Sequence, residues 1–234
     1  MNYPSNCLSC GLYKNCSSWN IKGRGAQPAD ILIVGQGPGR NEDFEGQIFV
    51  GPSGQFLQDF LDRLDVSWRL CNATNCYPGK NPDGQGDIKP TKEQVEACSV
   101  FLKEEIAACQ PKVIICLGDT AMRAVLGEQA PRTLTEAKRR TYTFEGIKVL
   151  VNLHPVNHVT GRQNLLDRYV QMFTYAEKLV SGEVGDDFFK HFMITKPYQF
   201  QEEKVGKVIY LDVETAVHKD NPDKRTLFHP KAKL

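Results

Sequence analysis

Residues 30–39 read DILIVGQGPG, an apolar run that ends in a glycine-rich turn. A short apolar run bounded by turn residues is typical of a strand that is buried on both faces. Further strands are expected at residues 69–74, 112–117 and 148–153. Strands buried on both faces indicate a parallel sheet, because its crossover connections place helices on each side.

The segments between the strands have the spacing of helices. Residues 53–65 place apolar side chains at the intervals of one helix face. A capping-box pattern at Thr91 predicts a helix that ends near residue 109. Two more helices are expected over residues 118–126 and 163–181. Strands that alternate with helices predict an α/β fold of three layers, α/β/α, around a central, mainly parallel, four-stranded sheet.

Polar features lie at the carboxyl ends of these strands. They are the turn over residues 35–39, the segment that contains Asn72, and His154. Ligands of open α/β sheets bind beyond the carboxyl ends of the strands. We therefore expect these three features, which come from distant parts of the sequence, to form one site.

The cysteines include an uneven 2 + 1 + 1 pattern. Cys7 and Cys10 form a CxxC pair, while Cys76 and Cys98 lie far along the chain. Four thiolates suit either a tetrahedral zinc ion or an iron–sulfur cluster, and their spacing alone leaves the choice open. Cys16, six residues after Cys10, is a further candidate ligand.

The composition restricts the partners and the compartment. The 234-residue chain has a net charge of +1, so any DNA-binding surface must be a local patch. No stretch approaches the roughly 18 apolar residues of a membrane span, and the N-terminus lacks the features of a signal peptide. We expect a cytoplasmic protein, in which a cysteine cluster indicates metal binding rather than disulfides.

The character of the sequence changes after the last expected helix. Residues 1–182 are expected to form one domain, and residues 183–206 a linker. Residues 207–234 begin with a strand pattern, KVIYLDVETA, that carries Asp212 and Glu214. This last segment is too short to complete another α/β domain.

Four segments resemble the motifs of one protein family. Residues 35–54, GQGPGRNEDFEGQIFVGPSG, resemble the first motif of the iron–sulfur uracil-DNA glycosylases, and residues 71–81, CNATNCYPGKN, resemble the second. Residues 97–121 resemble the helix of the fourth cysteine and the strand after it, and residues 153–155, LHP, resemble the final His-Pro motif. The resemblance runs in collinear order over residues 5–180. Each motif alone is weak, but the ordered set is specific.

The resemblance implies a uracil-DNA glycosylase of the family 4 type that carries a [4Fe–4S] cluster. Its ligands would be Cys7, Cys10, Cys76 and Cys98, and the cluster would have a structural role. Such enzymes extrude the target nucleotide from the DNA helix and read its Watson–Crick edge. The implied reaction is the dissociative hydrolysis of the N-glycosidic bond of deoxyuridine, which leaves an abasic site.

The resemblance also implies a uracil pocket. Phe49 would stack on the flipped base, and Asn72 would present its amide to the polar edge of uracil. His154 would donate a hydrogen bond to uracil O2 as negative charge builds on the leaving base. Backbone amides of the turn at Gln36 and Gly37 would help to hold the same oxygen.

Two further polar residues match the family near this pocket. Glu42 would support a water molecule or the sugar cation, and Asn81 would contact the substrate. The chain departs from the family at Gln36, where the family has glutamate. A carboxylate there can steady an oxocarbenium-like sugar, whereas an amide carries no charge. This departure predicts a reduced catalytic rate.

The tail suggests a second interpretation. The pair Asp212 and Glu214 resembles the first motif of 3′–5′ exonucleases, whose carboxylates bind divalent metals. Certain large phages join a glycosylase-like domain to the exonuclease and polymerase domains of a replicative polymerase. The alternative function is therefore a catalytically weak DNA-binding accessory module of a phage replicative DNA polymerase. A zinc-bound structural protein is a third interpretation, which leaves the active-site motifs unexplained.

These interpretations imply a set of expected partners. The main partner would be uracil-containing DNA, single or double stranded, and polymerase or exonuclease domains would be further partners. No membrane partner is expected, and the chain is expected to be a monomer. Its setting would be the cytoplasm of a bacterial or phage-infected host cell.

Overall fold

The computed structural model describes residues 4–84, 86–138 and 140–185 of the chain. The chain divides into two compact units, Met1–Pro197 and Tyr198–Leu234. All the described residues belong to the first unit. The strand pattern expected after residue 206, with Asp212 and Glu214, therefore lies outside the described residues.

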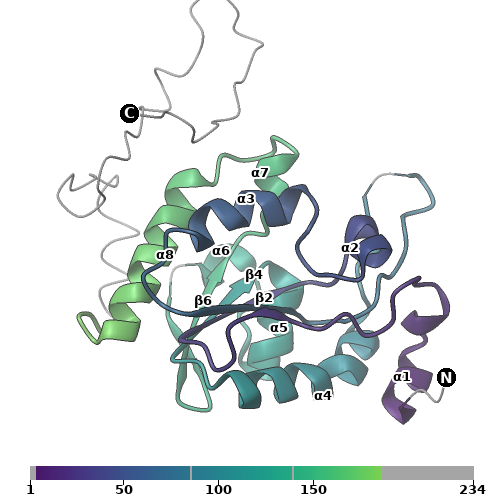
Figure 1. Cartoon of the computed structure of the whole chain (residues 1–234), viewed down its shortest axis with the longest axis horizontal. Helices are drawn as coiled ribbons and strands as arrows, with labels where there is room; N and C mark the ends of the chain where they lie inside the picture. The colour runs from purple at the N-terminus through teal and green to yellow at the C-terminus, as the bar shows by residue number, and fades with distance from the viewer. Residues whose placement is uncertain (1–3, 85, 139, 186–234) are drawn as a thin grey trace, which may run out of the picture. The chain divides into compact units, whose positions relative to one another are not determined.

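The first unit contains a six-stranded sheet with the order β1-β3-β2-β4-β6-β5 (Figure 1). Its four central strands are mutually parallel. They are β3 (Trp68–Asn72), β2 (Ile31–Gly35), β4 (Val113–Leu117) and β6 (Ile147–Asn152). The four predicted strands and their parallel arrangement are confirmed, with bounds that shift by a residue or two.

Two short antiparallel strands extend the sheet at its edges, so the sheet has six strands rather than the four expected. They are β1 (Arg24–Gly25), which pairs with β3, and β5 (Tyr142–Phe144), which pairs with β6. Neither has the apolar run by which the central strands were identified. The turn between β5 and β6 places Glu145 and Gly146 at φ values of 48° and 83°. Two consecutive left-handed residues are typical of a tight hairpin.

Helices cover both faces of the sheet, which confirms the three-layer fold class. The longer helices are α3 (Pro52–Leu61), α4 (Lys92–Cys109), α5 (Asp119–Leu126) and α8 (Leu166–Ser181). The shorter ones are α1 (Ser5–Cys10), α2 (Arg40–Glu45), α6 (Leu134–Ala137) and α7 (Val156–Val159), with 3-10 turns η1 (Leu12–Lys14) and η2 (Gly127–Gln129). Figure 1 shows α3 and α8 on one side of the strands and α4 on the other. No helix in the described ranges is long and apolar enough to cross a membrane.

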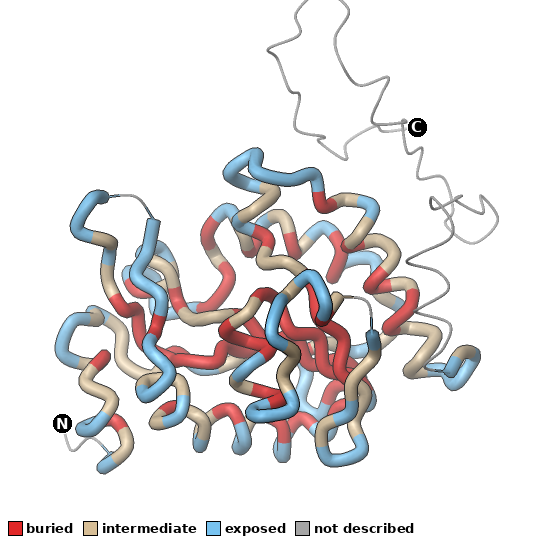
Figure 2. Tube along the Cα trace, turned by 180° about the vertical axis from the view of Figure 1, so that it is seen from behind, coloured by how far each residue is buried: buried red, intermediate tan, exposed pale blue. Residues whose placement is uncertain are grey.

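Two hydrophobic clusters hold these layers together. Alternate side chains of β2 take part in each: Ile31 and Ile33 pack with α3 and α8, whereas Leu32 and Val34 pack with α4 and α5. Figure 2 shows the buried residues gathered along the strands, between exposed outer surfaces. Because each buried aliphatic side chain contributes about 1.5–3 kcal/mol, the central strands form a rigid base for the loops at their carboxyl ends.

A buried ion pair fixes α4 against the edge of the sheet. Arg69 Nε of β3 lies 2.6 Å from Glu105 Oε2 of α4, and both side chains are largely buried. The guanidinium of Arg69 also donates to the carbonyl of Gly25, in the edge strand β1. Hydrogen bonding to Glu105 raises the pKa of Arg69 and keeps it charged. The pair sets the position of the helix that carries Cys98.

Candidate functional site

Four cysteines from three parts of the chain surround one pocket. Cys7 and Cys10 come from α1, Cys76 from the loop after β3, and Cys98 from α4. The helix α1 packs beside α4, where Asn6 Nδ2 donates to the carbonyl of Ala97 over 3.0 Å (Figure 1). Asn6 and Ala97 also line the pocket, and the remaining lining residues are Leu12, Tyr13, Trp19, Asn20, Asn75 and Phe101. The fold therefore brings together the four cysteines of the 2 + 1 + 1 pattern.

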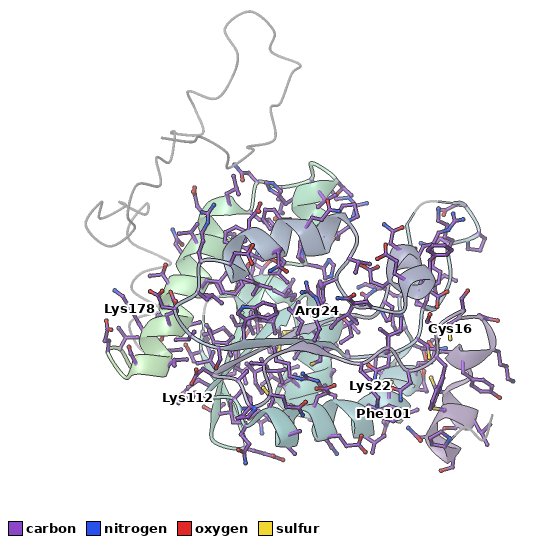
Figure 3. The ribbon with its side chains drawn as sticks, in the orientation of Figure 1. Cys16, Lys22, Arg24, Phe101, Lys112 and Lys178 are labelled. Atoms are coloured by element: carbon purple, nitrogen blue, oxygen red, sulfur yellow. The ribbon has the colours of Figure 1, made fainter. Side chains whose placement is uncertain are left out.

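Local backbone geometry and burial shape this cysteine pocket. Gly11 ends α1 in the left-handed conformation, with φ of 73°, and donates to the carbonyl of Cys7. Burial raises the pKa of Cys98 to about 11 and also raises the pKa of Cys76. The ammonium of Lys22 lies 5.1 Å from the centre of the Phe101 ring at the edge of the pocket (Figure 3). Thiols that are buried in this way lose their protons readily only when a bound cation stabilises the thiolates.

Cys16 lies beside this set. Its thiol donates to the carbonyl of Tyr13 over 3.7 Å and also interacts with the thiol of Cys76. Figure 3 shows Cys16 among the sulfur atoms at the N-terminal end of the molecule. The structure thus places a fifth thiol next to the four that line the pocket.

A second group of residues meets at the carboxyl end of β2. Gly35 is in register with Asn72 of the neighbouring strand β3. A Cβ atom added to Gly35 would collide with both Asn72 Oδ1 and Phe49 Cζ. The aromatic ring and the amide therefore approach each other over a position where only glycine fits.

Phe49 has a strained backbone. Its φ is 54°, a left-handed conformation that is unusual for an aromatic residue. Its carbonyl group lies against Gly54 in the first turn of α3, so closely that a Cβ there would overlap it. Such conformations persist only where the surroundings enforce them, and they cluster at functional sites. The backbone of this loop and the packing of Phe49 in the hydrophobic core together set the direction of the ring.

Glu42 is the residue that holds this loop. Its carboxylate accepts from the backbone N–H groups of Gly39 over 3.0 Å, Val50 over 3.0 Å and Gly51 over 2.8 Å. These bonds tie both the glycine turn after β2 and the segment after Phe49 to α2. The role expected for Glu42 was support of a water molecule or of the sugar cation. In the structure its oxygen atoms instead accept hydrogen bonds from the backbone.

Asp43 was not identified from the sequence. The side chain is buried, at 6% exposure, and accepts from the backbone N–H groups of Ser17 and Ser18 at 2.9 Å and 3.0 Å. An acidic residue in the first turn of a helix is usually solvated, so the residue type did not indicate that Asp43 is buried. The only signal in the sequence was its position next to Glu42. The loop that it holds leads from Cys16 to the pocket residue Trp19.

The glycine turn after β2 packs against two threonines. The side-chain oxygen of Gln36 accepts from the hydroxyl of Thr120, in the first turn of α5, over 3.0 Å. Its backbone carbonyl accepts from the N–H of Thr74 over 3.1 Å. A Cβ on Gly37 would collide with Thr74 Oγ1. Thr120 was also missed from the sequence, because its contact with Gln36 spans 84 residues.

His154 stands two residues beyond β6, at the same edge of the sheet. Its Nδ1 atom accepts from the N–H of Val156 over 3.2 Å, so the neutral ring carries its proton on Nε2. Burial lowers the pKa of His154 to about 4, although part of the residue is exposed to solvent. A Cβ on Gly118, at the end of β4, would lie 3.4 Å from His154 Cβ. At neutral pH the site therefore offers an uncharged hydrogen-bond donor.

Asn81 lies on the loop between β3 and α4, further from this edge. Its side chain donates to the carbonyl of Asp87 over 3.3 Å. The carboxylate of Asp87 accepts from the hydroxyl of Tyr77 over 2.8 Å and approaches Gly39 of the glycine turn. The structure thus links the loop of Asn81 to the site through Asp87.

A buried hydroxyl holds the strand end that precedes His154. Tyr169 of α8 donates to the carbonyl of Leu153 over 2.7 Å and is fully buried. We expect Tyr169→Phe to lower the free energy of unfolding by about 1–3 kcal/mol, because the buried carbonyl loses its partner. Urea denaturation measures this difference.

Tyr142→Phe is the matched control for that substitution. The hydroxyl of Tyr142 is buried without a hydrogen-bond partner among the described residues, so its removal leaves no group unsatisfied. We expect its free energy of unfolding to stay near the wild-type value. An equal loss in both variants would contradict the role given to Tyr169.

Comparisons with known proteins find similarity to uracil-DNA glycosylases and to one phage DNA polymerase. The family model "Uracil DNA glycosylase superfamily" matches residues 22–175. A type-4 uracil-DNA glycosylase of Archaeoglobus fulgidus is 32% identical over 176 residues, which cover 71% of this chain and 84% of the relative. One of Thermotoga maritima is 32% identical over 168 residues, covering 70% and 83%. A DNA polymerase of Bacillus phage SP01 is 22% identical over 215 residues, covering 86% of this chain and 22% of the polymerase.

Proposed function

The chain belongs to the uracil-DNA glycosylase superfamily, and on that premise we propose that it excises uracil from DNA by hydrolysing the N-glycosidic bond of deoxyuridine. The observation that carries this proposal is the meeting of Phe49 and Asn72 over Gly35, with His154 at the same edge of the sheet. An aromatic face, an amide and a neutral imidazole are the groups needed to hold an extruded pyrimidine.

Base recognition begins with Phe49 and Asn72. The ring of Phe49 stacks on the flipped base, a contact worth about 1–3 kcal/mol that any base can make. The amide of Asn72, 5% exposed, accepts from N3–H of uracil and donates to O4. Cytosine presents a bare N3 and an amino group at these positions. Discrimination between the two pyrimidines therefore rests on the amide.

Departure of the base depends on stabilising the charge that develops on it. His154 donates from Nε2 to uracil O2, and the backbone amides of the turn at Gln36 and Gly37 help to hold that oxygen. Since the imidazole is already neutral, it stabilises the anion without a prior change of protonation. Preorganised donors of this kind act through electrostatics, not through nucleophilic attack.

The glycosidic bond breaks by a dissociative path in which the sugar gains positive charge. In this chain Glu42 acts by fixing the loop that carries Phe49, since its oxygen atoms accept from three backbone amides. Gln36 adds hydrogen bonding without charge, and its side-chain oxygen is engaged by Thr120. Water then forms a C–O bond at C1′ of the sugar cation, which leaves an abasic site, and the proton that it loses neutralises the uracil anion.

We propose a [4Fe–4S] cluster bound by Cys7, Cys10, Cys76 and Cys98. Support comes from their placement around one pocket, lined otherwise by mostly apolar and aromatic residues. Four thiolates suit either a zinc ion or an iron–sulfur cluster, and the resemblance to the iron–sulfur uracil-DNA glycosylases favours the cluster. Such a cluster would join α1, the loop after β3 and α4.

DNA is the proposed partner of the sheet edge, with Asn81 on a loop that flanks it. We propose that residues 1–182 form the glycosylase domain and that residues 183–206 connect it to a segment, 207–234, that is similar to the start of an exonuclease. A catalytically weak accessory module of a phage replicative polymerase is the second candidate function. The match to the phage SP01 polymerase over 86% of the chain and the glutamine at Gln36 favour it.

The decisive experiment is a uracil-excision assay. The purified chain is incubated with an oligonucleotide that contains one deoxyuridine, and alkali then cleaves the strand at any abasic site. A product band supports the glycosylase, whereas tight binding of the oligonucleotide without a product supports the accessory module. Iron and sulfide content, with absorbance near about 400 nm typical of iron–sulfur proteins, separates a cluster from zinc.

Asn72→Ala tests the base-reading amide. We expect kcat/KM on uracil-containing DNA to fall about tenfold to a hundredfold, because two hydrogen bonds to the base are lost from a buried site. The iron content and the affinity for a duplex without uracil should remain at their wild-type values. Unchanged excision in this variant would show that the amide does not read the base.

A further inference from the structure

Helix α2 carries two adjacent carboxylates that hold different loops. It spans Arg40–Glu45 and ends at Gly46, in the left-handed conformation. Asp43 accepts from backbone N–H groups on the N-terminal segment, and Glu42 from those around the Phe49 loop. In Figure 1, α2 lies between α3 and the N-terminal segment that contains α1. One short helix is therefore anchored to two regions that are distant in sequence.

On the cysteine side, both oxygen atoms of Asp43 accept from the N–H of Ser17 over 2.9 Å, and one also accepts from Ser18 over 3.0 Å. The next two residues, Trp19 and Asn20, line the cysteine pocket. Hydrogen bonds to a buried carboxylate are stronger than those between neutral groups. A change in the pocket that moves this segment therefore acts on α2 through Asp43.

On the base side, Glu42 accepts from the N–H groups of Val50 and Gly51, which follow Phe49 directly. The left-handed backbone of Phe49 has to be enforced by its surroundings, and these two bonds are part of what enforces it. A shift of α2 therefore changes the support of the aromatic ring.

We infer that α2 couples the cysteine pocket to the base-stacking loop, with Asp43 as the positioning residue. The inference deepens the proposed function and rests on it for the role of Phe49 and for the cluster. A separate route joins the two regions along the chain, because Asn72 precedes Cys76 by four residues. The chain connects the cysteine pocket to the amide of Asn72, whereas α2 connects it to the ring of Phe49. Each of the two proposed base-binding groups therefore has its own connection to the cysteine pocket.

Hydrogen–deuterium exchange of individual amides tests this coupling directly. The amides of Val50 and Gly51 exchange when their bonds to Glu42 open. In the wild-type protein we expect removal of iron with a chelator to raise their exchange rates about tenfold, within the usual 5- to 150-fold range of coupling between two sites. In Asp43→Ala we expect rates that are already raised in the iron-loaded protein and that iron removal does not raise further.

Two more variants sharpen the test. Glu45→Gln is the matched control, because Glu45 is exposed on the same helix and should leave the response to iron at the wild-type level. Asp43→Asn keeps one acceptor oxygen and should respond to iron between wild type and Asp43→Ala. A graded response of this kind separates positioning from a general loss of stability. Circular dichroism confirms that each variant is folded.

The outcomes distinguish this inference from the proposed function. The coupling is wrong if iron removal does not change the exchange rates of Val50 and Gly51 in the wild-type protein. It is also wrong if iron removal still raises these rates in Asp43→Ala. A chain that takes up no iron overturns it too, together with the proposed cluster. The expected exchange pattern in a protein that excises no uracil supports the coupling and overturns the glycosylase.

Discussion

His154→Ala is expected to slow uracil excision by about a hundredfold to a thousandfold, the cost usually measured when one donor to a developing oxyanion is removed. The reason is geometric. The N–H of Val156 donates to Nδ1, which leaves Nε2 as the donor that we propose for the leaving base. Alanine removes that donor, and the amide of Asn72 does not replace it because we assign that amide to the opposite oxygen of the base, O4.

Single-turnover excision, with enzyme in excess over DNA, measures this loss without interference from product release. Iron content and affinity for undamaged duplex serve as controls, and both should match the wild type because His154 lies outside the cysteine pocket. A loss below about threefold, roughly 0.7 kcal/mol in activation free energy, would remove His154 from the mechanism.

The titration of His154 adds an expectation about pH. Its pKa is lowered to about 4 in the folded protein, against about 6.5 in an unfolded chain. Between these values the unfolded chain binds more protons, so stability is lost as the pH falls through this window. Wild type should therefore lose more unfolding free energy than His154→Ala between pH 7 and about pH 4, by urea denaturation. An equal loss in both would show that the imidazole is not held neutral by folding.

Cys98→Ser is the second substitution with a large expected effect. Cys98 lies on α4 and lines the pocket together with the cysteines of α1. A hydroxyl does not replace a thiolate as a ligand of iron. We expect the iron content to fall at least about tenfold, because ligand loss removes binding energy that also orders the site. Excision should fall with it, by about a hundredfold, because the coupling that we infer connects the cysteine pocket to the groups that we propose to bind the base.

Cys109→Ser is the control for this variant. It makes the same change on the same helix, and its side chain faces the core, where it donates to the carbonyl of Ala29 over 3.6 Å. A serine there keeps a donor, so iron content and excision should stay close to wild type. A normal iron content in Cys98→Ser would exclude Cys98 from the ligand set.

Much of the fold could be predicted from the sequence because burial leaves a simple pattern. The runs around Ile33 and Ile115 have no polar residue on either face, which is typical of a strand covered by helices on both sides. The capping box at Thr91 was likewise visible, and its Oγ1 accepts from the N–H of Gln94 as expected. The edge strands left no such pattern, since two or three residues are too few to show one.

The candidate site was predicted only in part, for a related reason. The parallel strands place Asn72 and His154 at the same carboxyl edge of the sheet, as expected from the topology, and the strands β2 and β4 lie between theirs. The approach of Phe49 to Gly35 depends on the left-handed backbone of Phe49, and this conformation cannot be predicted from the residue type. Asp43 acts on amides 25 and 26 residues away, and its type alone gives no sign of this. Contacts made to the backbone leave almost no trace in the sequence.

Gly35 tolerates substitution far less than the other positions of the same strand. Interior positions of β2, such as Ile33 and Val34, can exchange one aliphatic group for another at a modest loss of packing. At Gly35 the smallest enlargement, a single methyl group, displaces the ring and the amide together. Sequence drift could therefore change the body of the sheet gradually, whereas at Gly35 any larger side chain would displace both of the groups that we propose to bind the base.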